Sequence, residues 1–213
     1  MNIRLINEAG IAETDFTTIV TAVKYFVPLV TKAWAMPASS IIAGGTPEKG
    51  DWIIYVTERK RSTGATGYHT FENGVPVAYC SPKAAGRLFG TYSRPLIVKG
   101  KTIVPPRYTS GLITTICHEL AEMLCDPQIQ TLSPIDTHNR HWLVEVCDHC
   151  FGSFSVFTVG TIKCILPDVT TPSFYNLQGT APFSILGAAT APFTMTPKGY
   201  GYYKDATGKL IKL

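Results

Sequence analysis

The sequence lacks any long hydrophobic run. No stretch of its 213 residues approaches the roughly 20 apolar residues of a membrane-spanning helix. The first residues, MNIRLINEAG, also lack the apolar core of a signal peptide. We therefore expect no signal peptide, no transmembrane segment and no membrane partner. The cytoplasm is then the default location.

Charged residues are scarce as well, at 16%, and a net charge of +4 is spread thinly along the chain. The densest basic run, ERKRS at 58–62, contains no interleaved aromatic residues. A solvated loop explains it better than a nucleic-acid contact, so we expect no nucleic-acid partner. With 45% hydrophobic residues the chain can bury a substantial core, which excludes a disordered or fibrous protein.

The six cysteines show no regular spacing, and several lie in apolar context. In a chain of this length without a signal peptide they indicate free thiols rather than a disulfide framework. Cys147 and Cys150 form one Cys-x-x-Cys pair, with His141 and His149 close in sequence. They could form a separate structural zinc site, but no second pair exists to complete it. Free thiols are the preferred interpretation.

Apolar residues at helical spacing predict a first helix within residues 14–34. Thr14 or Asp15 can cap its start. Pro28 falls inside the pattern and should kink or divide the helix, because proline removes a backbone hydrogen bond.

Alternating and β-branched residues predict several short strands. Two of them should flank the Asn73-Gly74 turn. The others are expected at 51–58, 153–159, 161–167 and in a C-terminal hairpin over 199–213.

The pattern predicts an α+β fold with one domain over residues 1–213. We expect a metal-site helix against a small mixed sheet, followed by a strand-rich C-terminal tail. An inserted arm at about 81–106 is rich in apolar and basic residues and contains a possible hairpin that turns at Gly100-Lys101. A connection of this length is usually functional or a contact surface.

The segment TTICHELAEMLCDP, residues 114–127, predicts a second helix that carries three chemically active side chains. This helix should be capped by Thr109 or Ser110, should end near Cys125, and has a broad apolar face.

His118 and Glu122 lie four residues apart, so they share one face of this helix, and Glu119 projects about 100° around from His118. This is the geometry of the H-E-x-x-H metallopeptidase helix with a carboxylate in place of the second histidine. A solvated histidine–glutamate pair is the alternative.

A second acidic motif, EVCD, follows some two dozen residues downstream and contains Glu145 and Asp148. A catalytic zinc ion takes three protein ligands and keeps one position open for water. His118, Glu122 and Glu145 would supply these ligands, with Asp148 supporting them or exchanging roles with Glu145. Glu119 would then be the general base that acts on metal-activated water.

Five motifs occur in a recognisable order: GDW…Y at 50–55, GATGYH at 64–69, GVPVAY at 74–79, CHELAEMLCDP at 117–127 and EVCD at 145–148. This order resembles a largely uncharacterised zincin-like (HExxE) family of metallopeptidase-type proteins from tailed bacteriophages and bacteria.

The resemblance implies a metal site at His118 and Glu122 that Glu145 or Asp148 completes, with Glu119 as the catalytic glutamate. It also implies that His69 could face the cleft.

Two functions follow as expectations. The leading one is a metal-dependent peptide hydrolase, which would act on a peptide or protein substrate and use a divalent metal, most simply Zn²⁺ with Ca²⁺ as the alternative. The other is a catalytically silent structural or assembly protein of a virion that keeps the zincin fold and a bound ion. In that case the location is the virion, and the arm at 81–106 would make virion or self-assembly contacts.

Overall fold

The computed structural model describes residues 1–59, 65–86, 88, 97–98, 101–102 and 111–213. Its helices are α1 Glu13–Ala33, α2 Pro82–Ala85 and α3 Leu112–Cys125, with 3-10 helices η2 Asp148–Cys150 and η3 Pro172–Tyr175. Its strands are β1 Asn2–Asn7, β2 Ser40–Ala43, β3 Trp52–Val56, β4 Gly67–Glu72, β5 Val75–Cys80, β6 Ile97–Val98, β7 Lys101–Thr102, β8 Leu132–Ile135, β9 His141–Leu143, β10 Phe154–Val159, β11 Ile162–Pro167, β12 Tyr202–Lys204 and β13 Leu210–Lys212. The fold class is α+β, as predicted.

A five-stranded mixed sheet has the strand order β2-β1-β3-β5-β4. The first four strands pair in parallel, and β4 runs antiparallel to β5 at the edge. Asn73 and Gly74 reverse the chain between β4 and β5, and both have positive φ angles (51° and 83°). Such angles are those of a tight hairpin turn, which confirms the turn predicted there.

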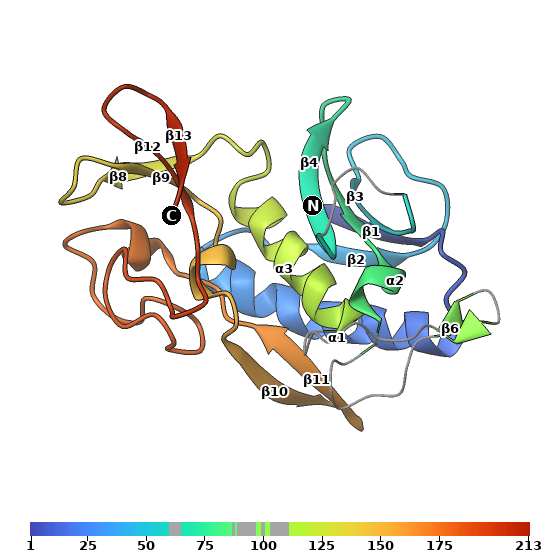
Figure 1. Ribbon diagram of the computed structural model, residues 1–213. Helices are drawn as coiled ribbons and strands as arrows, with labels where there is room; N and C mark the ends of the chain where they lie inside the picture. The colour runs from blue at the N-terminus through green and yellow to red at the C-terminus, as the bar shows by residue number, and fades with distance from the viewer. Residues whose placement is uncertain (60–64, 87, 89–96, 99–100, 103–110) are drawn as a thin grey trace.

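The helices α1 and α3 contact each other, and α3 also packs against β4 and β5 (Figure 1). Alternate residues of the strands, such as Ile54 and Ala78, are fully buried in the main hydrophobic cluster together with residues of both helices. Because side chains alternate along a strand, His69, which is paired with Ala78, lies on this same inner face. The sheet thereby directs a histidine from its edge strand toward α3.

Helix α1 differs from its prediction in two respects. It continues through Pro28 without division, and its N-cap is Ala12, which makes no side-chain capping bond. Thr14 and Asp15 lie inside the helix. The expected division was wrong because Pro28 lies on the exposed side of the helix, whereas its neighbour Val27 is buried. The carbonyl that loses its partner can therefore be hydrated while core packing holds the helix together.

Helix α3 ends at Cys125, as predicted, and Gly111 precedes it as the N-cap. The expected caps, Thr109 and Ser110, lie outside the described residues. The predicted apolar face is buried throughout, at Leu112, Ile113, Ile116, Leu120, Met123 and Leu124. In the described part of the chain, no helix is both long enough and apolar enough to cross a bilayer.

The C-terminal half of the chain packs on the other side of α3 from the five-stranded sheet (Figure 1). It contains the antiparallel pair β10-β11 and a four-stranded sheet of order β13-β12-β9-β8. These confirm the two strands predicted at 153–159 and 161–167 and the hairpin predicted at the C-terminus. Between β11 and β12 the chain has only the short helix η3 and one isolated bridge. This irregular stretch nonetheless reaches the main hydrophobic cluster through Phe174 and Ala189.

Most of the predicted arm at 81–106 lies outside the described residues. Its described parts are α2 and the antiparallel pair β6-β7, in which Val98 lies opposite Lys101. Lys101 is thus a strand residue, whereas Gly100, the other residue of the predicted turn, lies outside the described residues. The single-domain boundary and the arm as a contact surface stay predictions.

Candidate metal centre

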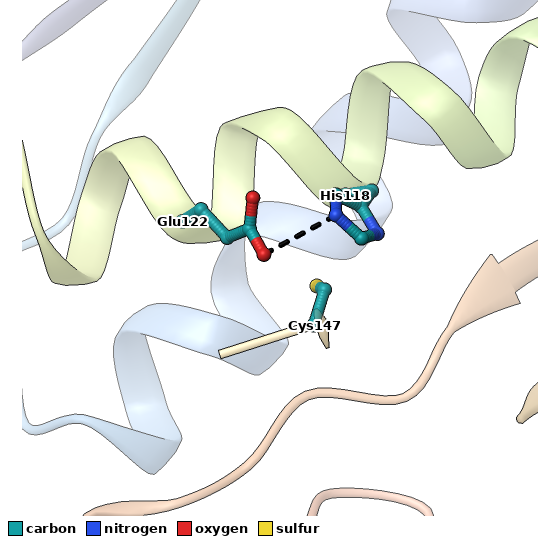
Figure 2. A group of neighbouring side chains, drawn as sticks. All are labelled: His118, Glu122 and Cys147. Carbon is teal, nitrogen blue, oxygen red and sulfur yellow. Dashed lines mark ion pairs between the residues drawn. The ribbon is translucent and has the colours of Figure 1, made fainter. Parts of the chain in front are cut away.

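His118 and Glu122 lie one turn apart on α3, and the Nε2 atom of His118 is 3.2 Å from Oε1 of Glu122 (Figure 2). The side chain of Glu122 is only 5% exposed and that of His118 15%. A solvated surface pair does not describe them, because the carboxylate is withdrawn from water.

Asp148 approaches His118 from the start of η2, which follows the loop after β9. Its Oδ1 atom is also 3.2 Å from Nε2 of His118. Despite these distances, neither Oδ1 of Asp148 nor Oε1 of Glu122 has a hydrogen-bond partner among the described residues. Both oxygens therefore lie at ion-pair distance from the same ring nitrogen.

The backbone of this loop is fixed by its neighbours. Nδ1 of the buried His149 is 2.7 Å from the carbonyl oxygen of Glu145, and the carbonyl of Val146 accepts hydrogen bonds from the amide and hydroxyl of Thr170. Burial lowers the pKa of His149 to about 4, so this imidazole is neutral and donates from Nδ1 to the carbonyl. The loop thus holds Asp148 in place through backbone contacts with the C-terminal half.

Cys147 is a third candidate ligand on the His118 side. One ligand atom each of His118, Glu122 and Cys147 lie within 4.8 Å of one another, and Figure 2 shows the cysteine directed toward the gap between the other two. Burial, together with Glu122 and Asp148, raises the pKa of its thiol well above the ordinary value, so without a metal the thiol is neutral. Sequence reasoning missed this role, since only the loop conformation turns Cys147 toward α3.

His69 on β4 forms a second group with Glu122 and Glu145. Its Nδ1 is 3.6 Å from Oε2 of both Glu119 and Glu122, and its Nε2 is 3.9 Å from Oε2 of Glu145. From sequence, Glu145 and Asp148 were interchangeable as the third ligand beside His118. The structure places Asp148 beside His118 and Glu145 beside His69.

Glu119 lies at the border of a cavity of about 240 Å³. The cavity is lined by Ala65, Thr66, Gly67, Thr114, Thr115, His118, Glu119, Phe151, Phe154 and Tyr200. Gly67 approaches α3 so closely that a Cβ atom there would stand 2.8 Å from Cγ2 of Thr115 and 2.9 Å from Cγ of Glu119. The absence of a side chain at this position lets β4 press against the glutamate.

Tyr200 brings the C-terminal half to this cavity. Its amide donates a hydrogen bond to the carbonyl of Asp148 (3.0 Å), and its ring packs against Phe151. Burial and the nearby carboxylate of Asp148 raise the pKa of the Tyr200 phenol above its ordinary value. Nothing in the local sequence pattern marked Tyr200, because only tertiary packing brings it to the site.

The buried charges perturb one another strongly. Burial alone would lower the pKa of His69, but Glu119, Glu122 and Glu145 raise it to about 9. The pKa of His118 is likewise raised, mainly by Glu122 and Asp148 against the opposing effect of burial. Burial and neighbouring carboxylates raise the pKa of Glu122, and that of Glu145 to about 9. Without a cation the cluster therefore holds extra protons, a sign that it lacks positive charge.

These residues fit a divalent metal ion. An ion with bonds of about 2.0–2.1 Å in tetrahedral geometry keeps its ligand atoms roughly 3.3 Å apart. The two 3.2 Å contacts of His118 match that spacing. The unpartnered oxygens of Glu122 and Asp148 are the atoms that such an ion would satisfy. The chain thus has residue groups that could hold a metal ion.

The alternative zinc site around Cys147 and Cys150 does not form among the described residues. Nδ1 of His141 faces the carbonyl oxygen of Ser133, and that of His149 faces the carbonyl of Glu145. All six cysteines are free and buried, as predicted from their irregular spacing.

No family model, curated protein or solved structure matches this chain. The zincin resemblance thus rests on the order of its motifs, and the family, its virion location and its activity stay predictions.

Proposed function

We propose that the protein is a metal-dependent peptide hydrolase of the zincin type, with an ion held by His118, Glu122 and Asp148. One observation carries the proposal. Buried ligand atoms that lack hydrogen-bond partners meet on α3 beside a cavity that is lined by both His118 and the carboxylate-bearing Glu119. Buried polar atoms without partners are costly, so they indicate a missing ligand or a functional role.

Within this proposal the residues have distinct roles. A divalent ion, when bound, supplies Lewis acidity that activates water and polarises a carbonyl group. Glu119 borders the cavity, so its carboxylate is placed to accept a proton from water and deliver it to the leaving amine. His69, 3.6 Å from Glu119, orients that carboxylate from the side of β4.

The donor set favours zinc over calcium. Calcium takes six to eight oxygen ligands, whereas zinc readily combines imidazole nitrogen, carboxylate oxygen and thiolate. The His118 side offers one nitrogen, carboxylate oxygens from Glu122 and Asp148, and the adjacent thiol of Cys147. Zn²⁺ is therefore the ion we propose.

The cavity is suited to an apolar group of a peptide. Phe151, Phe154 and Tyr200 share its lining with His118 and Glu119. A side chain bound among these rings would place the adjacent peptide bond near the glutamate. We therefore propose a peptide or protein substrate with an apolar residue next to the bond that is cleaved.

The test is the variant Glu119→Gln, compared with the wild type and with Glu13→Gln at an exposed position on α1. Cleavage of a broad peptide library and zinc content are measured on the same samples. The wild type and the α1 control should cleave, whereas Glu119→Gln should keep its zinc and lose about 10²–10⁴-fold in rate, since the base is not a ligand.

Two results would contradict the hydrolase. If zinc and activity fall together in Glu119→Gln, that residue is a ligand and not the base. If the zinc-loaded wild type cleaves nothing in the library, the catalytically silent structural or assembly protein, with a purely structural ion, becomes the better account.

A further inference from the structure

We infer that the protein binds a second divalent ion, held by His69 and Glu145, and that Glu122 bridges the two ions. The inference deepens the proposed function, because it rests on the same metal centre. It makes the centre dinuclear and assigns a site on the sheet side of α3.

The two oxygens of Glu122 face two different histidines. Oε1 is 3.2 Å from Nε2 of His118, and Oε2 is 3.6 Å from Nδ1 of His69. Glu122 belongs both to the group with His118 and to the group with His69 and Glu145, and in each group one ligand atom per residue lies within 4.8 Å of the others. A carboxylate shared by two such groups has the arrangement of a bridge between two ions.

Four atoms of the cluster are buried without a hydrogen-bond partner, and they divide equally between the two sides. On the first side they are Oε1 of Glu122 and Oδ1 of Asp148, whereas on the second they are Nε2 of His69 and Oε2 of Glu145. The second pair is 3.9 Å apart, and its two residues are only 9% and 7% exposed. His69 and Glu145 therefore direct unsatisfied ligand atoms at each other across a gap that a cation would fill.

A single ion does not serve both sides. Each group whose ligand atoms lie within 4.8 Å of one another contains one histidine, and the two groups share only Glu122. An ion beside His118 would leave Nε2 of His69 and Oε2 of Glu145 without a partner.

The charge of the cluster also favours more than one cation. Glu119, Glu122, Glu145 and Asp148 are all buried, and the ion pairs among the described residues give them only His69 and His118 as cationic partners. Two divalent ions would neutralise four ionised carboxylates and leave both histidines neutral, as ligands must be. One ion would leave two buried negative charges that only bound protons could neutralise, because an unpaired charge is costly in a desolvated site.

The experiment measures the number of ions per chain. The wild type and variants are stripped with a chelator, reloaded with Zn²⁺, freed of excess metal by gel filtration and analysed by mass spectrometry. We expect two ions in the wild type and in His138→Gln, an exposed histidine outside the cluster. We expect one ion in His69→Gln and one in His118→Gln.

A spectroscopic readout tests the bridge itself. The wild type loaded with Mn²⁺ should give the exchange-coupled electron paramagnetic resonance signal of two neighbouring ions. His69→Gln should give the hyperfine pattern of isolated Mn²⁺ instead. If His69→Gln does not fold, Glu145→Gln takes its place, because it removes the other ligand of the same ion.

One zinc ion in the wild type, with no change in His69→Gln or Glu145→Gln, would overturn the inference. Two ions retained in these variants would overturn it as well, since the second ion would then lie elsewhere. Two ions with coupled Mn²⁺ but no peptide cleavage would support the dinuclear centre and contradict only the proposed hydrolase.

Discussion

Glu145 is the residue at which the loss of stability caused by leaving the site without a metal ion is easiest to measure. Burial first, and then the charge of Glu122, raise its pKa from an ordinary 4.5 to about 9. The pKa of its neighbour His69 is raised from 6.5 to about 9. In both cases the folded protein holds a proton that the unfolded chain releases at lower pH. The free energy of unfolding of the metal-free protein should therefore fall as the pH rises toward 9.

Glu145→Gln should remove part of this decline, because glutamine cannot ionise. In the presence of a chelator, we expect the thermal midpoint of the variant to match that of the wild type near pH 4.5 and to exceed it increasingly up to pH 9. Thermal unfolding followed by circular dichroism over this range gives the comparison. The exposed Glu13→Gln should show no such pH-dependent difference, and a Glu145→Gln curve parallel to the wild type would contradict the assigned origin of the shift.

Tyr200 offers a prediction about zinc affinity. Its phenol lies near Asp148, so Tyr200→Phe removes a group that steadies a proposed ligand. Removal of such supporting contacts typically weakens metal binding about 10–100-fold. Isothermal titration with Zn²⁺ should show this loss.

Tyr202→Phe is the matched control, because Lys212 packs over the rings of both tyrosines while only Tyr200 lines the cavity. Equal zinc affinity in the two variants would mean that the Tyr200 hydroxyl does not support Asp148.

Single site residues could be predicted from the sequence where local backbone geometry alone determines their position. His118 and Glu122 could be paired because a spacing of four residues on a helix sets their separation. His69 could be identified only as a residue that could face the cleft, since its place depends on how β4 packs against α3. The sequence signal for the position of His69 was the alternation of side chains along a strand, which puts Gly67 and His69 on the same face of β4.

Among the elements, α3 and β4 together position the centre. Helix α3 is buried along nearly its whole length, so the side chains that it carries are held rigidly. Gly67 sets the distance between the two elements, because a Cβ there would collide with Thr115 and Glu119.

Gly67→Ala should therefore push β4 away from α3 and displace Glu119. Real Cβ atoms do not approach other atoms as closely as 2.8 Å, so the strand or the side chains of Thr115 and Glu119 have to shift. We expect peptide cleavage to fall by at least tenfold and the affinity for Zn²⁺ to drop, because His69 moves with the strand.

Gly160→Ala is the control for this substitution. Gly160 lies in the β10-β11 turn with φ +62°, and a Cβ added there would meet no atom within 4 Å, so alanine at this position encounters backbone strain alone. It should cost about 1–2 kcal/mol of stability and leave zinc binding unchanged. A Gly67→Ala variant that behaves like this control would show that the close approach has no role in the site.

Elements that depend only on neighbouring residues in the sequence were predicted correctly. The Asn73-Gly74 turn and the end of α3 follow from neighbouring residues. The uninterrupted passage of α1 through Pro28 depends on core packing, which no local pattern reveals. No element was predicted from the sequence for residues 144–150, which include η2, because their conformation is set by contacts with Thr170 and other residues far along the chain.

Across the whole molecule, the centre joins segments that are far apart in sequence. His69 comes from the edge of the sheet, His118 and Glu122 from the central helix, Asp148 from a loop, and Tyr200 from the C-terminal half. The parallel pairings β1-β3 and β3-β5, which place β4 at the edge, are non-local and could not be predicted from the sequence. The composition and strand patterns sufficed for the α+β class but not for this topology.

The central claim is that a metal ion binds between α3 and the loop at 145–148. Diffraction from crystals of the zinc-loaded protein, recorded on both sides of the zinc absorption edge, tests it most directly. We predict an anomalous peak about 2.0–2.2 Å from Nε2 of His118 and from carboxylate oxygens of Glu122 and Asp148. Zinc peaks found only at other places, such as Cys150 or the exposed His138, with none beside His118, would contradict it.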